Sequence, residues 1–130
     1  MIDAYLEGII QELSASPVVT AFNIARQEEG EEDGYIRIKC YLSNGDILEF
    51  AEYVEVLKEK VCVVTYSYHW QDAKGQVVKR WDNVGHHKEL NTFPYHVHLS
   101  AGEVIGTTSM TLNKVLKEIG KVLPAWYEEE

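Results

Sequence analysis

One short stretch of the chain, RWDNVGHHKELNTFPYHVH at residues 80–98, holds most of its side chains suited to chemistry. The candidate site residues in it are Arg80, Asp82, His86, His87, His96 and His98. Residues two apart on a β-strand point to the same face, so His96 and His98 would present their rings together. These residue types can bind a metal ion, transfer protons, or only stabilise a loop and a strand.

A metal site is the first interpretation. Neutral imidazole nitrogens are common ligands of zinc and other transition metals. The loop before His96 and His98 could fold His86 or His87 back over them, which would supply three or four nitrogen ligands. Asp82 could then be an oxygen ligand, or the acceptor that fixes a histidine tautomer. The sequence leaves the metal and any other cofactor open.

The same residues suit acid–base cleavage of RNA without a metal. One histidine would take the proton of a 2′-hydroxyl, a second would protonate the leaving oxygen, and Arg80 would hold the phosphate charge. Histidine suits both roles because its ordinary pKa of about 6.5 lies near neutrality, and the planar guanidinium of arginine matches phosphate. Unpaired bases could stack on the aromatic side chains of Tyr66, Tyr68, Trp70 and Trp81. Aromatic residues two apart on a strand are, however, more often part of the core or of the sheet surface than a base platform.

Structural and partner-binding roles are the alternative to both kinds of chemistry. Histidines often satisfy loop carbonyls. Arg80 and Asp82 are two apart on a predicted strand and could simply pair on its polar face, which is worth about 0–1 kcal/mol. His69 lies near a strand end, which favours an edge position over membership of the site. Three classes of protein therefore remain: an RNA-cleaving enzyme, a metal-dependent hydrolase and a non-catalytic protein-interaction module.

Periodicity predicts the elements that hold these residues. Apolar residues at helical spacing predict helices near both ends of the chain, and alternating or β-branched runs predict strands between them. Asn44-Gly45 is a strong hairpin signal, because both positions of a type I′ turn need positive φ. The predicted helices are residues 3–16 and 111–127, with Thr111 as N-cap, and the predicted strands are 18–29, 35–42, 46–54, 60–72 and 76–83, with 95–99 as a further short candidate. We predict a single α+β domain over residues 1–130: an antiparallel meander sheet of about five strands, flanked by the two helices on one face.

Amino-acid composition and net charge limit which partners the protein can bind. The 130 residues are 45% hydrophobic, enough for a core, and the net charge is −9, with 21 acidic and 12 basic residues. This balance argues against a protein that coats DNA or an anionic membrane, but it allows a local basic patch for RNA or a basic protein partner. Without a signal peptide or a long apolar run, we expect a cytoplasmic protein with no membrane contact. Cys40 and Cys62 lack CxxC spacing and are predicted to be buried free thiols, and an exposed aromatic sheet face would favour a homodimer.

Residues 66–99 resemble the signature of the TumE family, toxins of type II toxin–antitoxin pairs. The matching residues are Tyr66, Tyr68, His69, Trp70, Gly75, Arg80, Trp81, Asp82, Asn83, His86, His87, Phe93, Pro94, His96 and His98. Gly85 stands where the pattern has proline, and Tyr95 stands where a histidine is common, which removes one possible ligand or proton donor. The resemblance implies a small DNA-binding antitoxin as partner and growth inhibition through action on RNA.

Overall fold

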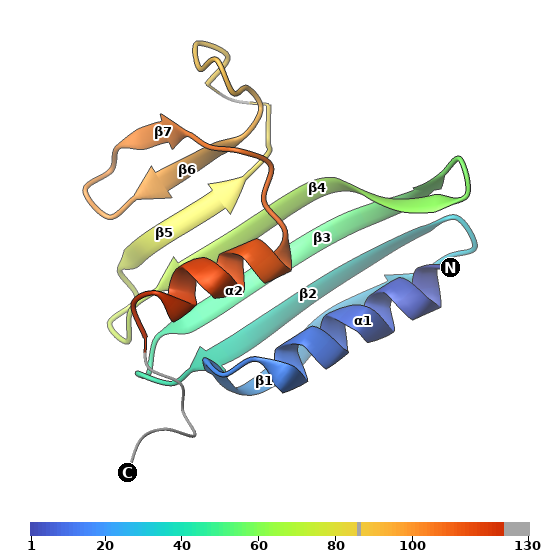
Figure 1. The fold of residues 1–130 in the computed structure, drawn as a ribbon, viewed down its shortest axis with the longest axis horizontal. Coiled ribbons are helices and arrows are strands. Elements are labelled where there is room, and N and C mark those ends of the chain that lie inside the picture. The colour runs from blue at the N-terminus through green and yellow to red at the C-terminus, as the bar shows by residue number, and fades with distance from the viewer. Residues whose placement is uncertain (86, 124–130) are drawn as a thin grey trace.

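An antiparallel sheet forms the centre of the protein (Figure 1). The computed structural model describes residues 1–85 and 87–123, and within them the sheet has seven strands. The strands are β1 (Val19–Glu29), β2 (Asp33–Leu42), β3 (Ile47–Leu57), β4 (Lys60–Gln71), β5 (Val77–Asp82), β6 (His96–Leu99) and β7 (Val104–Gly106). Each strand pairs with its neighbours in sequence, so the sheet is a meander in the order β1 to β7.

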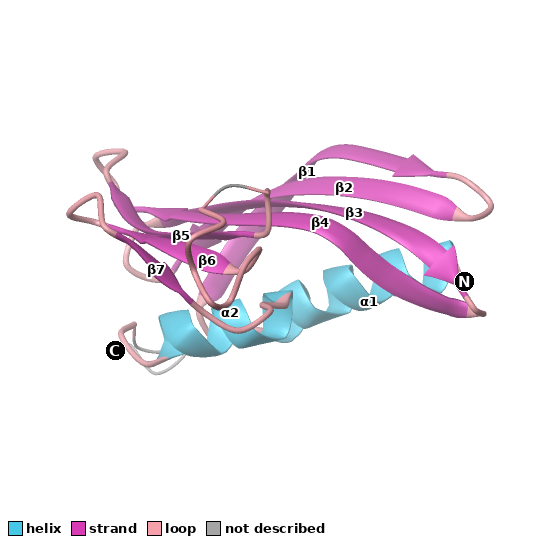
Figure 2. Cartoon of the chain, turned by 90° about the horizontal axis from the view of Figure 1, so that it is seen from above, coloured by secondary structure: helices cyan, strands magenta, loops and turns pink. Residues whose placement is uncertain are grey.

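Two helices cover one face of this sheet and leave the other face open (Figure 2). They are α1 (Ile2–Ala15) and α2 (Leu112–Gly120). The first ends beside Ser16, just before Pro17, and the second begins at Thr111, whose side-chain oxygen accepts a hydrogen bond from the Lys114 backbone nitrogen. The predicted α+β class with flanking helices is confirmed. In residues 1–85 and 87–123, neither helix has the length and apolar character needed to span a bilayer.

The predicted number of strands was too low, because the sheet continues past β5. The short candidate at residues 95–99 does form a strand, β6, and β7 was not predicted at all. Three residues are too few to show alternation, so β7 carries no sequence pattern of its own. It pairs with β6 through a tight turn in which Gly102 adopts a φ of 91°.

Alternation along the strands divides the sheet into a core face and an open face. On β2, Ile36, Ile38 and Cys40 are fully buried beneath the helices, while the residues between them face the open side. Burial raises the pKa of the Cys40 thiol to about 12. Cys62 is only half-buried, so the prediction of two buried thiols holds for Cys40 alone.

The aromatic residues of β4 belong to the core face, which excludes the base-stacking role considered for them and agrees with the alternative of a place in the core. Tyr66, Tyr68, Trp70 and Trp81 are all buried. Their polar atoms serve internal hydrogen bonds: Tyr66 accepts from the Met110 backbone nitrogen, and Trp70 donates to Asp46. These aromatic side chains stabilise the core, and they provide no exposed aromatic surface for a homodimer.

Tyr68 also contacts a buried acidic residue, Glu52, beneath α1. Its hydroxyl donates to Glu52 at 2.7 Å, and the hydroxyl of Tyr5 donates to the other oxygen of the same carboxyl. Glu52 is only 2% exposed, and burial raises its pKa.

Candidate functional site

The candidate site lies on the open face of β5 and β6. Arg80 pairs with His98 and Asp82 pairs with His96 across the two strands. Directly opposite residues in antiparallel strands share a face, so these four side chains lie together. Trp81, between Arg80 and Asp82, points to the core instead. The alternation of a single strand therefore separates the site from the core.

Asp82 is the centre of the hydrogen-bond network. Its side chain is 5% exposed, and its Oδ1 lies 2.8 Å from His96 Nε2 and 3.2 Å from the Val84 backbone nitrogen. Its Oδ2 lies 3.3 Å from Arg80 Nε and 3.5 Å from His98 Nε2. A buried carboxylate needs such partners, because an unpaired charge is costly to remove from water. The carboxylate thus fixes Arg80 and two imidazoles in one arrangement.

His96 is held at both ring nitrogens and is only 1% exposed. Its Nδ1 donates to the Pro94 carbonyl at 2.9 Å, and since a carbonyl only accepts, Nδ1 carries a hydrogen. Its Nε2 faces the Asp82 carboxyl, 2.8 Å from Oδ1. His96 therefore lies beneath the surface of the candidate site.

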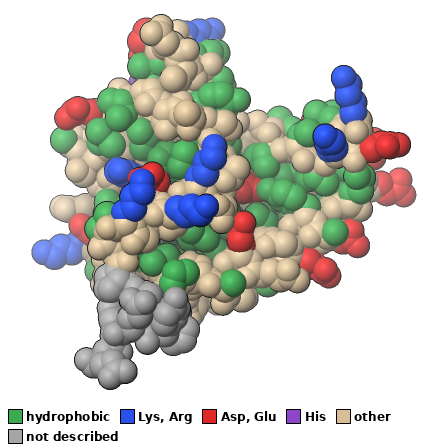
Figure 3. Space-filling view, in the orientation of Figure 1, with side chains coloured by type: hydrophobic (Ala, Val, Ile, Leu, Met, Phe, Trp, Pro, Cys, Tyr) green, Lys and Arg blue, Asp and Glu red, His purple; other side chains and the backbone are tan. Residues whose placement is uncertain are grey.

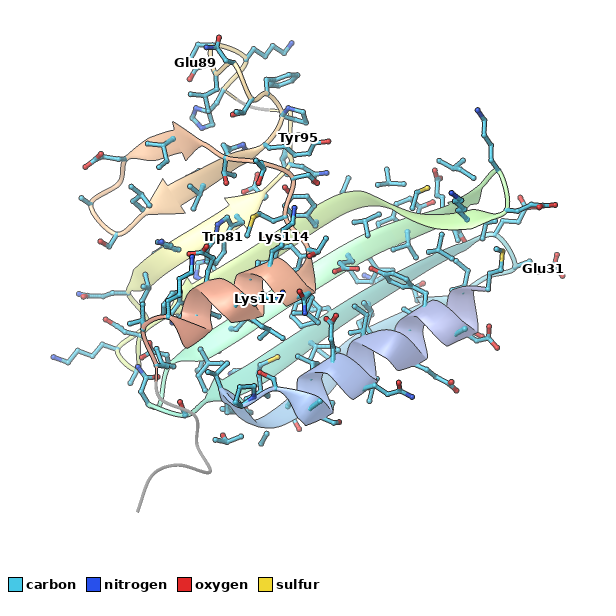
Figure 4. All side chains as sticks on the ribbon, in the orientation of Figure 1. Glu31, Trp81, Glu89, Tyr95, Lys114 and Lys117 are labelled. Atoms are coloured by element: carbon cyan, nitrogen blue, oxygen red, sulfur yellow. The ribbon has the colours of Figure 1, made fainter. Side chains whose placement is uncertain are left out.

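His87 approaches from the loop between β5 and β6. Its ring centroid lies 5.1 Å from that of His96 and 5.9 Å from that of His98. Its Nδ1 lies 3.2 Å from Glu89 Oε1, and Figure 4 shows Glu89 at the outer end of this loop. The His87 backbone has a φ of 58°, a left-handed conformation that costs a side-chain-bearing residue about 1–2 kcal/mol. His86, the other predicted histidine of this loop, lies outside the described residues.

Two histidines of the cluster are accessible to a substrate. The side chains of His87 and His98 are 33% and 34% exposed. Burial lowers the pKa of His98, and the nearby Asp82 carboxylate offsets part of that effect. A neutral His98 can accept a proton near neutral pH, so the accessible part of the site can perform acid–base chemistry.

Two further residues position the site. Asn83 joins β5 to β4, because its side-chain oxygen accepts from the Tyr66 backbone nitrogen at 2.8 Å and its nitrogen donates to the Val64 carbonyl at 3.0 Å. Gly106 lets the loop pack against β7, since a side chain there would approach Thr92 Oγ1 to 2.3 Å. Asn83 belongs to the motif recognised in the sequence, but no sequence signal marked Gly106.

His69 lies beside the site and not at a sheet edge, which corrects the prediction. Its strand β4 runs between β3 and β5, and His69 pairs with Glu49 on one side and Arg80 on the other. These three residues, with Arg37 and Ser67, line a hollow of about 240 Å³ on the open face. Burial lowers the pKa of His69, and the positive charge of Arg80 lowers it further.

The histidine cluster also has the composition of a metal site. One nitrogen from each of His87, His96 and His98 can be chosen so that all three lie within 4.8 Å of one another. Three imidazoles and the Asp82 carboxylate form a donor set that suits zinc. However, both ring nitrogens of His96 already have hydrogen-bond partners, so ligation would require His96 to release Pro94 or Asp82.

The fold and site define an α+β protein with a histidine, arginine and aspartate cluster on the open face of a meander sheet. The family model described as Toxin TumE matches residues 7–123, and the chain therefore belongs to the TumE toxin family. This confirms the resemblance seen in the sequence. Comparisons with curated proteins and with solved structures gave no match. Membership of a toxin family implies an antitoxin partner.

Proposed function

We propose that this toxin cleaves RNA by general acid–base chemistry at the histidine cluster. The observation that carries the proposal is the convergence of Arg80 and His98 on one oxygen of Asp82, with the His87 ring 5.9 Å from the His98 ring. Arginine and accessible histidines at a shared point meet the geometric requirement for an active site better than scattered surface residues would.

The proposed roles follow from exposure and charge. His98, whose pKa burial lowers, takes the proton of the 2′-hydroxyl. The 2′-oxygen then bonds to phosphorus as the bond to the 5′-oxygen breaks, and His87 gives its proton to that leaving oxygen. Arg80 holds the negative charge on the phosphate. The products are a 2′,3′-cyclic phosphate and a free 5′-hydroxyl.

The buried residues act through the accessible ones. Asp82 orients Arg80 and His98, and it is held in place by His96 and by the Val84 backbone nitrogen. The role of His86 stays a prediction. We also propose a cytoplasmic location, because growth inhibition by RNA cleavage requires access to cellular RNA. A small DNA-binding antitoxin would be the partner that neutralises the toxin.

Metal-dependent hydrolysis is a second candidate, which the close approach of the three histidine nitrogens favours. The metal would be held by His87, His96 and His98, with Asp82 as a further ligand or acceptor, and it would activate a water molecule. Addition of a chelator distinguishes the two mechanisms, because only the metal-dependent one loses activity and recovers it with zinc.

The test is cleavage of a labelled single-stranded RNA by the purified protein, with mass spectrometry of the products. We compare wild type with His98→Gln and His87→Gly, and we use Lys114→Gln as the control. Lys114 lies on α2, on the other side of the sheet (Figure 4). Loss of one acid–base group should lower the rate by about 10²–10⁴-fold.

Three outcomes decide the proposal. Cyclic-phosphate products that disappear in folded His98→Gln but persist in Lys114→Gln support it. Absence of cleavage by wild type points to the third class, a protein-interaction module, and removes the proposal. Cleavage that folded His98→Gln and His87→Gly retain at the wild-type rate would place the chemistry elsewhere.

A further inference from the structure

The open face of the sheet carries two rows of side chains that begin at the candidate site. Neighbours within each row are opposite one another on adjacent strands, so each row crosses the sheet at a single level. The first row is His96, Asp82, Ser67, Ala51, Arg37 and Arg26, and the second is His98, Arg80, His69, Glu49, Lys39 and Asn23. We call these two rows the open-face track.

The open-face track is a basic strip on an acidic protein. It contains four basic side chains against two acidic ones, Asp82 and Glu49, whereas the whole chain has a net charge of −9. Asp82 is enclosed by its partners, so the accessible charge is more positive than this count. The acidic residues of this face lie mainly beyond the track, where Asp33 pairs with Glu55.

The arginines of the track are accessible to a ligand. Arg26, Arg37 and Arg80 have side chains that are 42–62% exposed. Arg37 pairs with Glu49 at 3.0 Å and Arg26 pairs with Glu28, but ion pairs this exposed are worth only about 0–1 kcal/mol. A phosphate group can therefore compete for these guanidinium groups at little cost.

Tyrosines flank the basic residues on β2. The Arg26 guanidinium lies 4.9 Å from the ring centroid of Tyr35, and the Lys39 ammonium lies 5.7 Å from that of Tyr41. Tyr35 is half-buried and Tyr41 is exposed, unlike the core aromatic residues of β4. Cations interleaved with accessible aromatic rings are typical of surfaces that bind single-stranded nucleic acid through phosphates and base stacking.

The track is longer than one nucleotide site. Lys39 and Arg80 lie three strand spacings apart, which corresponds to roughly 14 Å. The hollow lined by Arg37, Ser67 and His69 lies between them and opens beside Arg80. A strand with its phosphate at Arg80 would therefore extend its neighbouring nucleotides over the hollow and toward β2.

We propose that the open-face track binds single-stranded RNA across β5 to β1, with Arg37 and Lys39 contacting phosphates away from the cleavage point. The position of the scissile phosphate at Arg80 rests on the proposed function. Binding by the track does not require cleavage, so the two can be tested apart.

The test is binding of a fluorescent 2′-O-methyl RNA dodecamer, which has no free 2′-hydroxyl to react, followed by anisotropy over a series of salt concentrations. The variant is Arg37→Gln with Lys39→Gln. The control is Lys114→Gln with Lys117→Gln, which removes the same number of charges from α2 on the helix-covered side (Figures 3 and 4). Basic side chains also gather over α2 in Figure 3, so the control tests the competing surface.

We expect the track variant to bind at least tenfold more weakly and to lower the salt dependence by about 1.4 in slope, since each phosphate contact on a single strand contributes about 0.7. The control should bind as wild type does. In cleavage assays, the track variant should lose far more activity on the unmodified dodecamer than on a dinucleotide.

Each alternative result has one meaning. Wild-type affinity and slope in the track variant, no binding by wild type, or a loss confined to the α2 control would each overturn the inference. RNA binding as expected without any RNA cleavage supports binding by the track and contradicts the proposed function. Equal cleavage of the dodecamer by wild type and the track variant contradicts RNA binding by the track but is compatible with the proposed function.

Discussion

Asp82→Asn perturbs the centre of the candidate site while keeping the shape of the side chain. The carboxylate has two accepting oxygens, and the structure uses both. Oδ1 accepts from the Val84 backbone nitrogen and faces His96 Nε2, while Oδ2 faces Arg80 and His98. An amide has only one accepting oxygen, so one of these positions must hold a donor.

Neither orientation of the new amide satisfies the network. With nitrogen in place of Oδ1, the Val84 N–H faces another donor, and with nitrogen in place of Oδ2, the amide N–H faces the Arg80 guanidinium. A buried polar group left without a partner costs about 1–3 kcal/mol. Loss of the half-exposed pair with Arg80 adds about 0–1 kcal/mol. We therefore expect the free energy of unfolding to fall by about 1–4 kcal/mol.

Urea unfolding followed by tryptophan fluorescence measures this change, because Trp70 and Trp81 are buried. The control is Glu49→Gln, which removes a carboxylate from the same face where it is 41% exposed, and it should change stability by less than about 1 kcal/mol. The slope of the transition should be the same in both variants. If Asp82→Asn lies within about 0.5 kcal/mol of wild type, or Glu49→Gln costs as much, the hydrogen-bond argument is wrong.

Three further predictions concern single residues. His87→Gly should be more stable to urea than His87→Ala by about 1 kcal/mol, because glycine accepts the positive φ of 58°, and equal stability would contradict this conformation. Burial lowers the pKa of His69 and of His98, so below about pH 6.5 the unfolded chain binds protons that the folded protein does not. The melting temperature should therefore fall as the pH is lowered through this range, and His69→Gln should make this fall smaller. Burial raises the pKa of Glu52, so ionisation of this carboxyl destabilises the fold as the pH rises. Relative to wild type, Glu52→Gln should therefore gain more stability at about pH 8 than at about pH 5. An equal gain at both pH values would refute this explanation.

Strand alternation allowed the sequence to predict which of the candidate site residues lie together. The i and i+2 spacing placed Arg80 with Asp82 and His96 with His98, and the register of β5 and β6 brought both pairs together. What spacing could not show was depth. His96 is buried and His98 is a third exposed, although both lie on the same face of β6, and only the structure shows that His96 is held between Asp82 and the Pro94 carbonyl.

The same reasoning left open which face of β4 is buried. Tyr66, Tyr68 and Trp70 alternate as a surface platform would, and only the position of the helices decides that they face the core. His69 belongs to the opposite set and so falls on the open face, beside Arg80. Likewise, β7 was missed because its three residues gain their pairing from β6 and not from a pattern of their own.

The alternation of Arg80, Trp81 and Asp82 also limits how the chain can change in length. A deletion or insertion of one residue within β5 would turn Trp81 toward solvent and its two neighbours toward the core, which would destroy the site and the packing together. Asn83 is hydrogen-bonded to the β4 backbone and so fixes the end of this strand, which leaves little freedom to accommodate an added or missing residue. Variation in length should therefore be confined to the turns between strands, such as the one at Gly75, and substitutions should be the main route by which this region diverges.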